Sequence, residues 1–117
     1  MKGMTRRGES AGKGPGEDLF DRAREVADAL KEVPEVAATE YSTGKSSIRI
    51  LFAVPDRHVG DLIRRIFEGF RREPDVPEAA YRIGIYDLDD RNIILNLDID
   101  GEHAGPVRDA LKGIRRC

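Results

Sequence analysis

A repeated pattern of strand followed by helix constrains the fold of this chain more than any other feature. The stretch 48–70, IRILFAVPDRHVGDLIRRIFEGF, alternates apolar and polar residues and then continues with helical spacing. Residues 93–114, IILNLDIDGEHAGPVRDALKGI, repeat this pattern at an offset of about 45 residues, which is typical of a repeated supersecondary unit. The same offset aligns Tyr41 with Tyr86. The sequence therefore predicts two copies of one folding unit.

The patterns on either side of the repeat complete the element order. Apolar residues at helical spacing predict a first helix that begins at Glu17 and closes at Pro34. Asp56, after Pro55, is expected to cap the second helix. The predicted strands cover 36–42, 46–54, 80–86 and 92–99, and the later helices cover about 56–72 and 103–115.

This order is α-β-β-α-β-β-α and predicts an α+β fold. Two ββα units side by side would form one four-stranded, antiparallel-type sheet with helices on one face. This is a ferredoxin-like-related sandwich whose final strand has moved to the front. If the two repeated strands pair centrally and in parallel, each crossover is expected to be right-handed. The αββαββα order of single-chain homing endonucleases is an alternative, but that class needs an acidic residue ending a tightly packed helix pair, and residues 30–33, LKEV, do not offer one.

The predicted domain organisation is a tail followed by one domain. Residues 1–16 are rich in glycine and lack apolar periodicity, so we expect a flexible basic tail. Residues 17–117 are expected to form a single α+β domain, with the repeats at about 36–72 and 80–116. The tail has four basic residues against one acidic residue, and a basic arm of this kind could sample nucleic-acid phosphates.

Composition limits the class of protein. A chain of 117 residues with 39% hydrophobic and 36% charged residues is expected to form one globular domain. No apolar run reaches the ~20 residues of a membrane span, and the N-terminus lacks an apolar signal core, so we expect a cytoplasmic protein. The net charge of −2 predicts no strong overall attraction to nucleic acid. The excess of Arg over Lys and the absence of Gln fit a thermophile or a GC-rich genome.

No motif predicts a catalytic, metal or cofactor site. His58 and His103 occupy equivalent repeat positions, but no further His or Cys lies at metal-binding spacing, so we interpret them as markers of the repeat. Residues 96–101, NLDIDG, resemble the start of a calcium loop, but position twelve is Val107 rather than the required Glu. The aspartates at 87, 89 and 90 are typical turn formers. We therefore predict that the protein is not an enzyme and needs no cofactor.

Arginines on the predicted helices are the strongest surface signal. The candidates for contacts with a protein partner or nucleic acid are Arg64, Arg65, Arg71, Arg72, Arg108, Arg115 and Arg116. A stripe of this kind could follow phosphates. However, Asp61 and Glu68 lie at the spacing of ion pairs along one helix. The sequence leaves both interpretations open.

The stretch 46–114 resembles the small dimerising subunit of the KEOPS tRNA-modification complex, the cancer/testis-antigen-like family. The resemblance rests on residues 48–56, IRILFAVPD, on 91–99, RNIILNLDI, and on 107–111, VRDAL; the chain departs from the family at Lys112, where Asn or Ser is usual. The resemblance implies a non-catalytic subunit that pairs with itself or a paralogue and contacts a threonylcarbamoyl-transferase partner, with Arg108 and the last helix as the place of contact.

These observations predict a non-catalytic interaction or dimerisation module, and the resemblance implies an accessory subunit of a tRNA-modifying, threonylcarbamoyladenosine-forming complex. The alternative is a small nucleic-acid-binding protein that uses the basic tail and the Arg-rich helix face. We expect a protein partner or self-association, leave RNA open, and expect no membrane contact.

Overall fold

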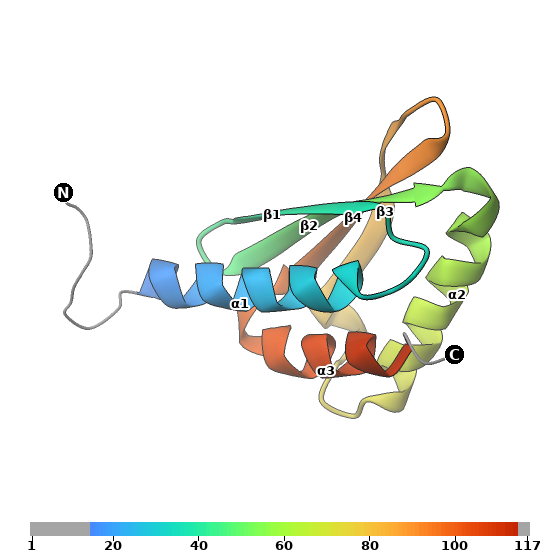
Figure 1. The fold of residues 1–117 in the computed structure, drawn as a ribbon. Helices are drawn as coiled ribbons and strands as arrows, with labels where there is room; N and C mark the ends of the chain where they lie inside the picture. Colours follow the sequence, from blue (N-terminus) through green and yellow to red (C-terminus); the bar gives the residue numbers. More distant parts are fainter. Residues whose placement is uncertain (1–14, 115–117) are drawn as a thin grey trace, which may run out of the picture.

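The computed structural model describes residues 15–114, with side chains from residue 18, and confirms the predicted α+β order (Figure 1). The helices are α1 (Pro15–Lys31), α2 (Asp56–Arg72) and α3 (Ala104–Ile114), and the strands are β1 (Ala38–Thr43), β2 (Ser47–Pro55), β3 (Tyr81–Leu88) and β4 (Asn92–Asp100). Short 3₁₀ turns, η1 (Glu78–Ala80) and η2 (Gly101–His103), precede β3 and α3. Helix α1 begins two residues before the predicted start, and the rest of the predicted tail lies outside the described residues.

The four strands form one antiparallel sheet in the order β1-β2-β4-β3. The repeated strands β2 and β4 pair at the centre, but they are antiparallel, so the conditional expectation of parallel pairing is wrong. The physical reason is that β3 and β4 form a tight hairpin, which reverses the chain before β4 enters beside β2. Leu51 pairs with Asn96, its own repeat equivalent, so the two units are related by a pseudo-two-fold at the centre of the sheet.

All three helices cover the same face of the sheet (Figure 1). The alternation of the central strands turns one set of apolar side chains toward these helices, and that set is almost completely buried: Ile48, Ile50, Phe52, Val54, Leu95, Leu97 and Ile99. Leu30, Leu62 and Leu111 supply one fully buried leucine from each helix. The core is therefore formed between one sheet face and the helix layer.

Two predicted helix starts need correction. Pro55 occupies the position before α2, where no side chain caps the helix, and Asp56 is already helical, so its prediction as the cap is wrong. Pro55 remains the last residue of β2 and pairs with Asn92, because strand pairing extends to the first turn of the helix. His103 belongs to η2, and α3 starts at Ala104.

Gly101 lets the last unit pack against α1. Its N–H donates to the Ser46 carbonyl at 2.8 Å. A Cβ at this position would contact the Leu19 side chain and would lie 2.9 Å from the Ser46 oxygen. Glycine is required here by this close approach of the backbone to its neighbours.

Candidate interaction surface

Ion pairs within the protein occupy three of the predicted arginines. Arg64 lies 2.6 Å from Asp61 and 3.3 Å from Glu68. The Asp61 carboxylate also contacts Arg65 at 3.0 Å, and hydrogen bonding to the two guanidinium groups lowers its pKa. Arg108 bonds to Glu25 of α1 at 2.6 Å, and this contact raises the pKa of the arginine.

Arg65 is mostly buried and forms an ion pair inside the protein. Its side chain is only 11% exposed and lies 2.6 Å from the Glu35 carboxylate, which is 24% exposed. Glu35 belongs to the connection between α1 and β1, so this pair links that connection to α2. The guanidinium lowers the pKa of Glu35, and Glu35 in turn raises the pKa of Arg65.

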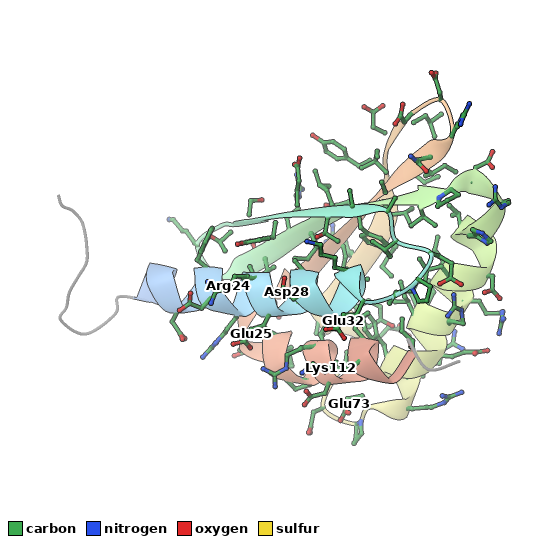
Figure 2. All side chains as sticks on the ribbon, in the orientation of Figure 1. Arg24, Glu25, Asp28, Glu32, Glu73 and Lys112 are labelled. Carbon is green, nitrogen blue, oxygen red and sulfur yellow. The ribbon has the colours of Figure 1, made fainter. Side chains whose placement is uncertain are left out.

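The remaining predicted arginines do not form a continuous basic surface in the described part of the chain. Arg71 and Arg72 are exposed in the last turn of α2, whereas Arg115 and Arg116 lie outside the described residues. Acidic and basic side chains alternate along the helix layer. Figure 2 shows this mixing, with Arg24, Glu25, Asp28 and Glu32 along α1 and Lys112 on the neighbouring α3.

The antiparallel pairing of β2 and β4 separates the two equivalent histidines. His58 follows the end of β2 that pairs with Asn92, and His103 follows the end of β4 that pairs with Ser47. These ends are about eight residues apart along the strands, or roughly 26 Å at the rise of a strand. His103 lies 3.9 Å from both Asp100 and Glu102, and His58 is not part of that group. One site that uses both histidines is therefore excluded by the topology.

The acidic residues of the hairpin and of β4 have local partners. Asp89 accepts a hydrogen bond from the Asp90 N–H at 2.7 Å, as expected of a turn residue. Asp87 accepts one from the Leu88 N–H at 2.8 Å, but it lies in β3, paired with Ile94, so its prediction as a turn residue is wrong because the strand continues to Leu88. Asp98 pairs with Arg49 of β2 at 3.2 Å on the helix-free face of the sheet. The calcium-loop pattern is therefore part of a strand, as its apolar alternation indicated.

The feature that sequence reasoning missed is an apolar cluster on β3, which we call the β3 patch: Ile85, Tyr86 and Leu88. These side chains are 63%, 58% and 68% exposed, and β3 is an edge strand. Figure 1 shows the tip of the β3–β4 hairpin projecting from the sheet, away from the helix layer. Apolar alternation alone could not distinguish this strand from a buried one, because burial depends on whether a helix lies over it.

The second unit lacks a counterpart to α1, and this explains the exposure. In the first unit, α1 precedes β1 and its Phe20 ring lies 5.1 Å from Tyr41. In the second unit only the short η1 precedes β3. Tyr81, at the start of β3, packs on Phe70 of α2 at 4.5 Å, but no helix reaches the end of the strand.

A shallow hollow adjoins the β3 patch on the helix-free face of the sheet. It has a volume of about 260 Å³ and is bounded by residues of all four strands, including Leu51, Ala53, Ile94 and Tyr86. Of the β3 patch only Tyr86 lines this hollow, because Ile85 and Leu88 lie opposite Leu95 and Ile93 on the helix side of the sheet.

Comparison with known proteins gives no relative: no protein family, curated protein or solved structure matches this chain. Residues 15–114 also contain no helix that is long and apolar enough to cross a bilayer.

Proposed function

We propose that this protein is a non-catalytic interaction module whose partner binds at the β3 patch. The observation that carries this proposal is a cluster of three large apolar side chains on a free edge strand. Exposed apolar clusters of this kind are typical of protein–protein contact sites. Edge strands also offer unpaired backbone groups with which a partner strand can pair.

The charge distribution favours a protein partner over nucleic acid. A phosphate-binding surface needs cations that are free to approach the backbone of the nucleic acid. Arg64, Arg65 and Arg108 are instead held by carboxylates within the protein. The β3 patch is apolar, with Arg82 and Asp87 on the same strand.

A more specific proposal is that the protein is a cytoplasmic accessory subunit of a tRNA-modifying complex. The short motifs shared with the KEOPS small subunit support this proposal, and Arg108 on α3 is then the residue to examine for partner contact. Its ion pair with Glu25 leaves it 32% exposed, so it lies at the surface.

The test is affinity capture from the native extract with the full-length protein. We expect one identified protein, or a second copy of the chain, to be captured by the wild type and lost with the Ile85→Ser/Leu88→Ser variant. Phe20→Ser is the matched control, because it removes an exposed apolar side chain from α1 instead. Circular dichroism melts establish that each variant is folded.

Equal capture by the wild type and the double variant would contradict the proposed site. A captured partner unrelated to tRNA modification would overturn the more specific proposal. Binding to RNA that falls steeply with salt and weakens on deletion of residues 1–16 would favour the nucleic-acid alternative.

A further inference from the structure

We propose that the partner of the β3 edge is a second copy of this chain, joined by antiparallel pairing of two β3 strands about a two-fold axis at Gly84. This inference rests on the proposed function and names the occupant of the proposed site. In such a dimer the two sheets would form one continuous eight-stranded sheet. Both helix layers would lie on the same side, because a two-fold perpendicular to the sheet preserves its faces.

A β-bulge determines which β3 residues share a face. Ile85 pairs with Leu95 and Asp87 pairs with Ile94, so Tyr86 is the extra residue of the bulge. Before the bulge, Arg82 and Gly84 lie on the helix-free face, opposite Asp98 and Asn96 of β4. The bulge brings Asp87 onto this same face, although simple alternation would place it on the other one.

The helix-side residues of β3 are all apolar. They are Tyr81, Ile83, Ile85 and Leu88, which lie opposite Ile99, Leu97, Leu95 and Ile93 of β4. Ile83 is half-buried, whereas Ile85 and Leu88 are exposed. A partner that covers this edge therefore gains most binding free energy by placing apolar side chains beside Ile85 and Leu88.

In one register of antiparallel pairing, each face of β3 is complementary to the same face of β3 in a second copy. With the axis at Gly84, and with Tyr86 left out of the count as the extra residue of the bulge, Arg82 of each copy would lie opposite Asp87 of the other, giving two Arg–Asp pairs. On the helix side, Ile83 lies opposite Ile85, and Tyr81 lies opposite Leu88. With the axis at Ile83, by contrast, Arg82 would lie opposite Gly84 of the other copy rather than opposite an acidic residue of that copy. Charge complementarity and apolar pairing thus favour the same register.

The charged groups in this register are available for the contact. Arg82 is exposed and has no side-chain ion pair among residues 18–114. Asp87 accepts the Leu88 N–H with one carboxylate oxygen, and no group among residues 18–114 bonds to the other oxygen. A side chain at Gly84 would meet nothing within 4 Å, so the position on the axis is open.

The other edge of the sheet does not share these properties. On β1 the exposed strand residues are small or polar, namely Ala38, Glu40 and Ser42. The larger Tyr41 is packed against Phe20 of α1. Strand β1 therefore supplies the control for the experiment.

Disulfide trapping tests the register directly. Residues that face each other in an antiparallel pair have Cα atoms ~4.5–5.5 Å apart, within the range that a disulfide spans. In a Cys117→Ser background, we expect Gly84→Cys to form a covalent dimer under mild oxidation. Ser42→Cys, on the other edge, should remain mostly monomeric. Equal or faster trapping of Ser42→Cys would overturn the inference.

Charge reversal tests the same register without a covalent bond. Sedimentation velocity of the full-length protein should show a concentration-dependent dimer. Arg82→Asp should weaken it about tenfold, because two attractive pairs become repulsive. The double variant Arg82→Asp/Asp87→Arg should restore it. A wild type that is monomeric at all concentrations would refute the inference. So would a dimer whose dissociation constant is unchanged by Arg82→Asp, or is not restored by the double variant.

This outcome is separable from the proposed function. A monomeric wild type that still captures another protein through Ile85 and Leu88 would overturn self-association and leave the interaction site in place. Dimerisation that survives Ile85→Ser/Leu88→Ser would overturn the inference, whereas the proposed function is overturned only when capture of a partner also survives this double change.

Discussion

The replacement of Arg65 by methionine tests whether this arginine stabilises the fold through a mostly buried ion pair or serves only as a surface charge. The change keeps the apolar stem and removes the guanidinium that contacts Glu35 at 2.6 Å and Asp61 at 3.0 Å. It leaves the Glu35 carboxylate mostly covered, with one oxygen that already lacks a hydrogen-bond partner. The uncompensated charge is the source of the expected destabilisation.

The magnitude follows from the exposure of the two groups. Breaking a fully buried pair costs about 3–5 kcal/mol, whereas an exposed pair is worth about 0.2–1 kcal/mol. Arg65 is 11% exposed and Glu35 is 24% exposed, which places this pair between those limits. We expect Arg65→Met to lower the free energy of unfolding by about 2 kcal/mol, measured by urea denaturation.

Arg64→Met is the matched control, because Arg64 is 59% exposed and its partners are exposed too. It should change the free energy of unfolding by less than about 0.5 kcal/mol. Glu35→Gln/Arg65→Met should recover part of the lost stability, since the orphaned charge is then absent. Equal effects of Arg65→Met and Arg64→Met would refute the structural role of Arg65.

Two further predictions concern stability. The folded-state pKa of Glu35 is lowered from its usual value of 4.5, so its stabilising contribution is present above pH 4.5 and is lost as the pH falls through the lower folded value. The difference in unfolding free energy between the wild type and Glu35→Gln should therefore shrink from pH 6 to pH 3, and a constant difference would contradict this. Gly101→Ala should destabilise the protein by about 1–3 kcal/mol, because the added Cβ would meet Leu19 and the Ser46 oxygen. Gly105→Ala, where a Cβ would have open space around it, should not destabilise the protein. Thermal melts that show similar losses of stability for both variants would contradict the packing argument.

The topology shows why a correct repeat led to an incorrect expectation. The offset between Ile48 and Ile93 follows from local pattern, and both residues do lie on the central strands. Nothing in the repeat specifies the relative direction of the two units. The β3–β4 hairpin determines it, and its closing bond from the Asp89 N–H to the Asn92 carbonyl is local to the turn.

The arginine candidates show a second limit of sequence reasoning. Arg64 and Arg65 are adjacent in the chain, and the helical pattern placed both on the polar face. Only the three-dimensional structure brings Glu35, from a connection about 30 residues earlier, against Arg65 and not Arg64. Ion pairs within one helix were predictable from spacing, whereas a pair between distant segments was not.

The sequence by itself determined the element order, the repeat and the buried face of the central strands. It could do so because apolar periodicity is a local property that the backbone geometry of each element translates directly into a face. The tertiary structure decided the direction in which β2 and β4 pair, the separation of His58 from His103 and the exposure of the β3 patch. These depend on which elements lie beside each other. Among the described residues no second helix like α1 precedes β3, and the end of that strand is left uncovered although Ile85 and Leu88 are as apolar as the side chains of the core.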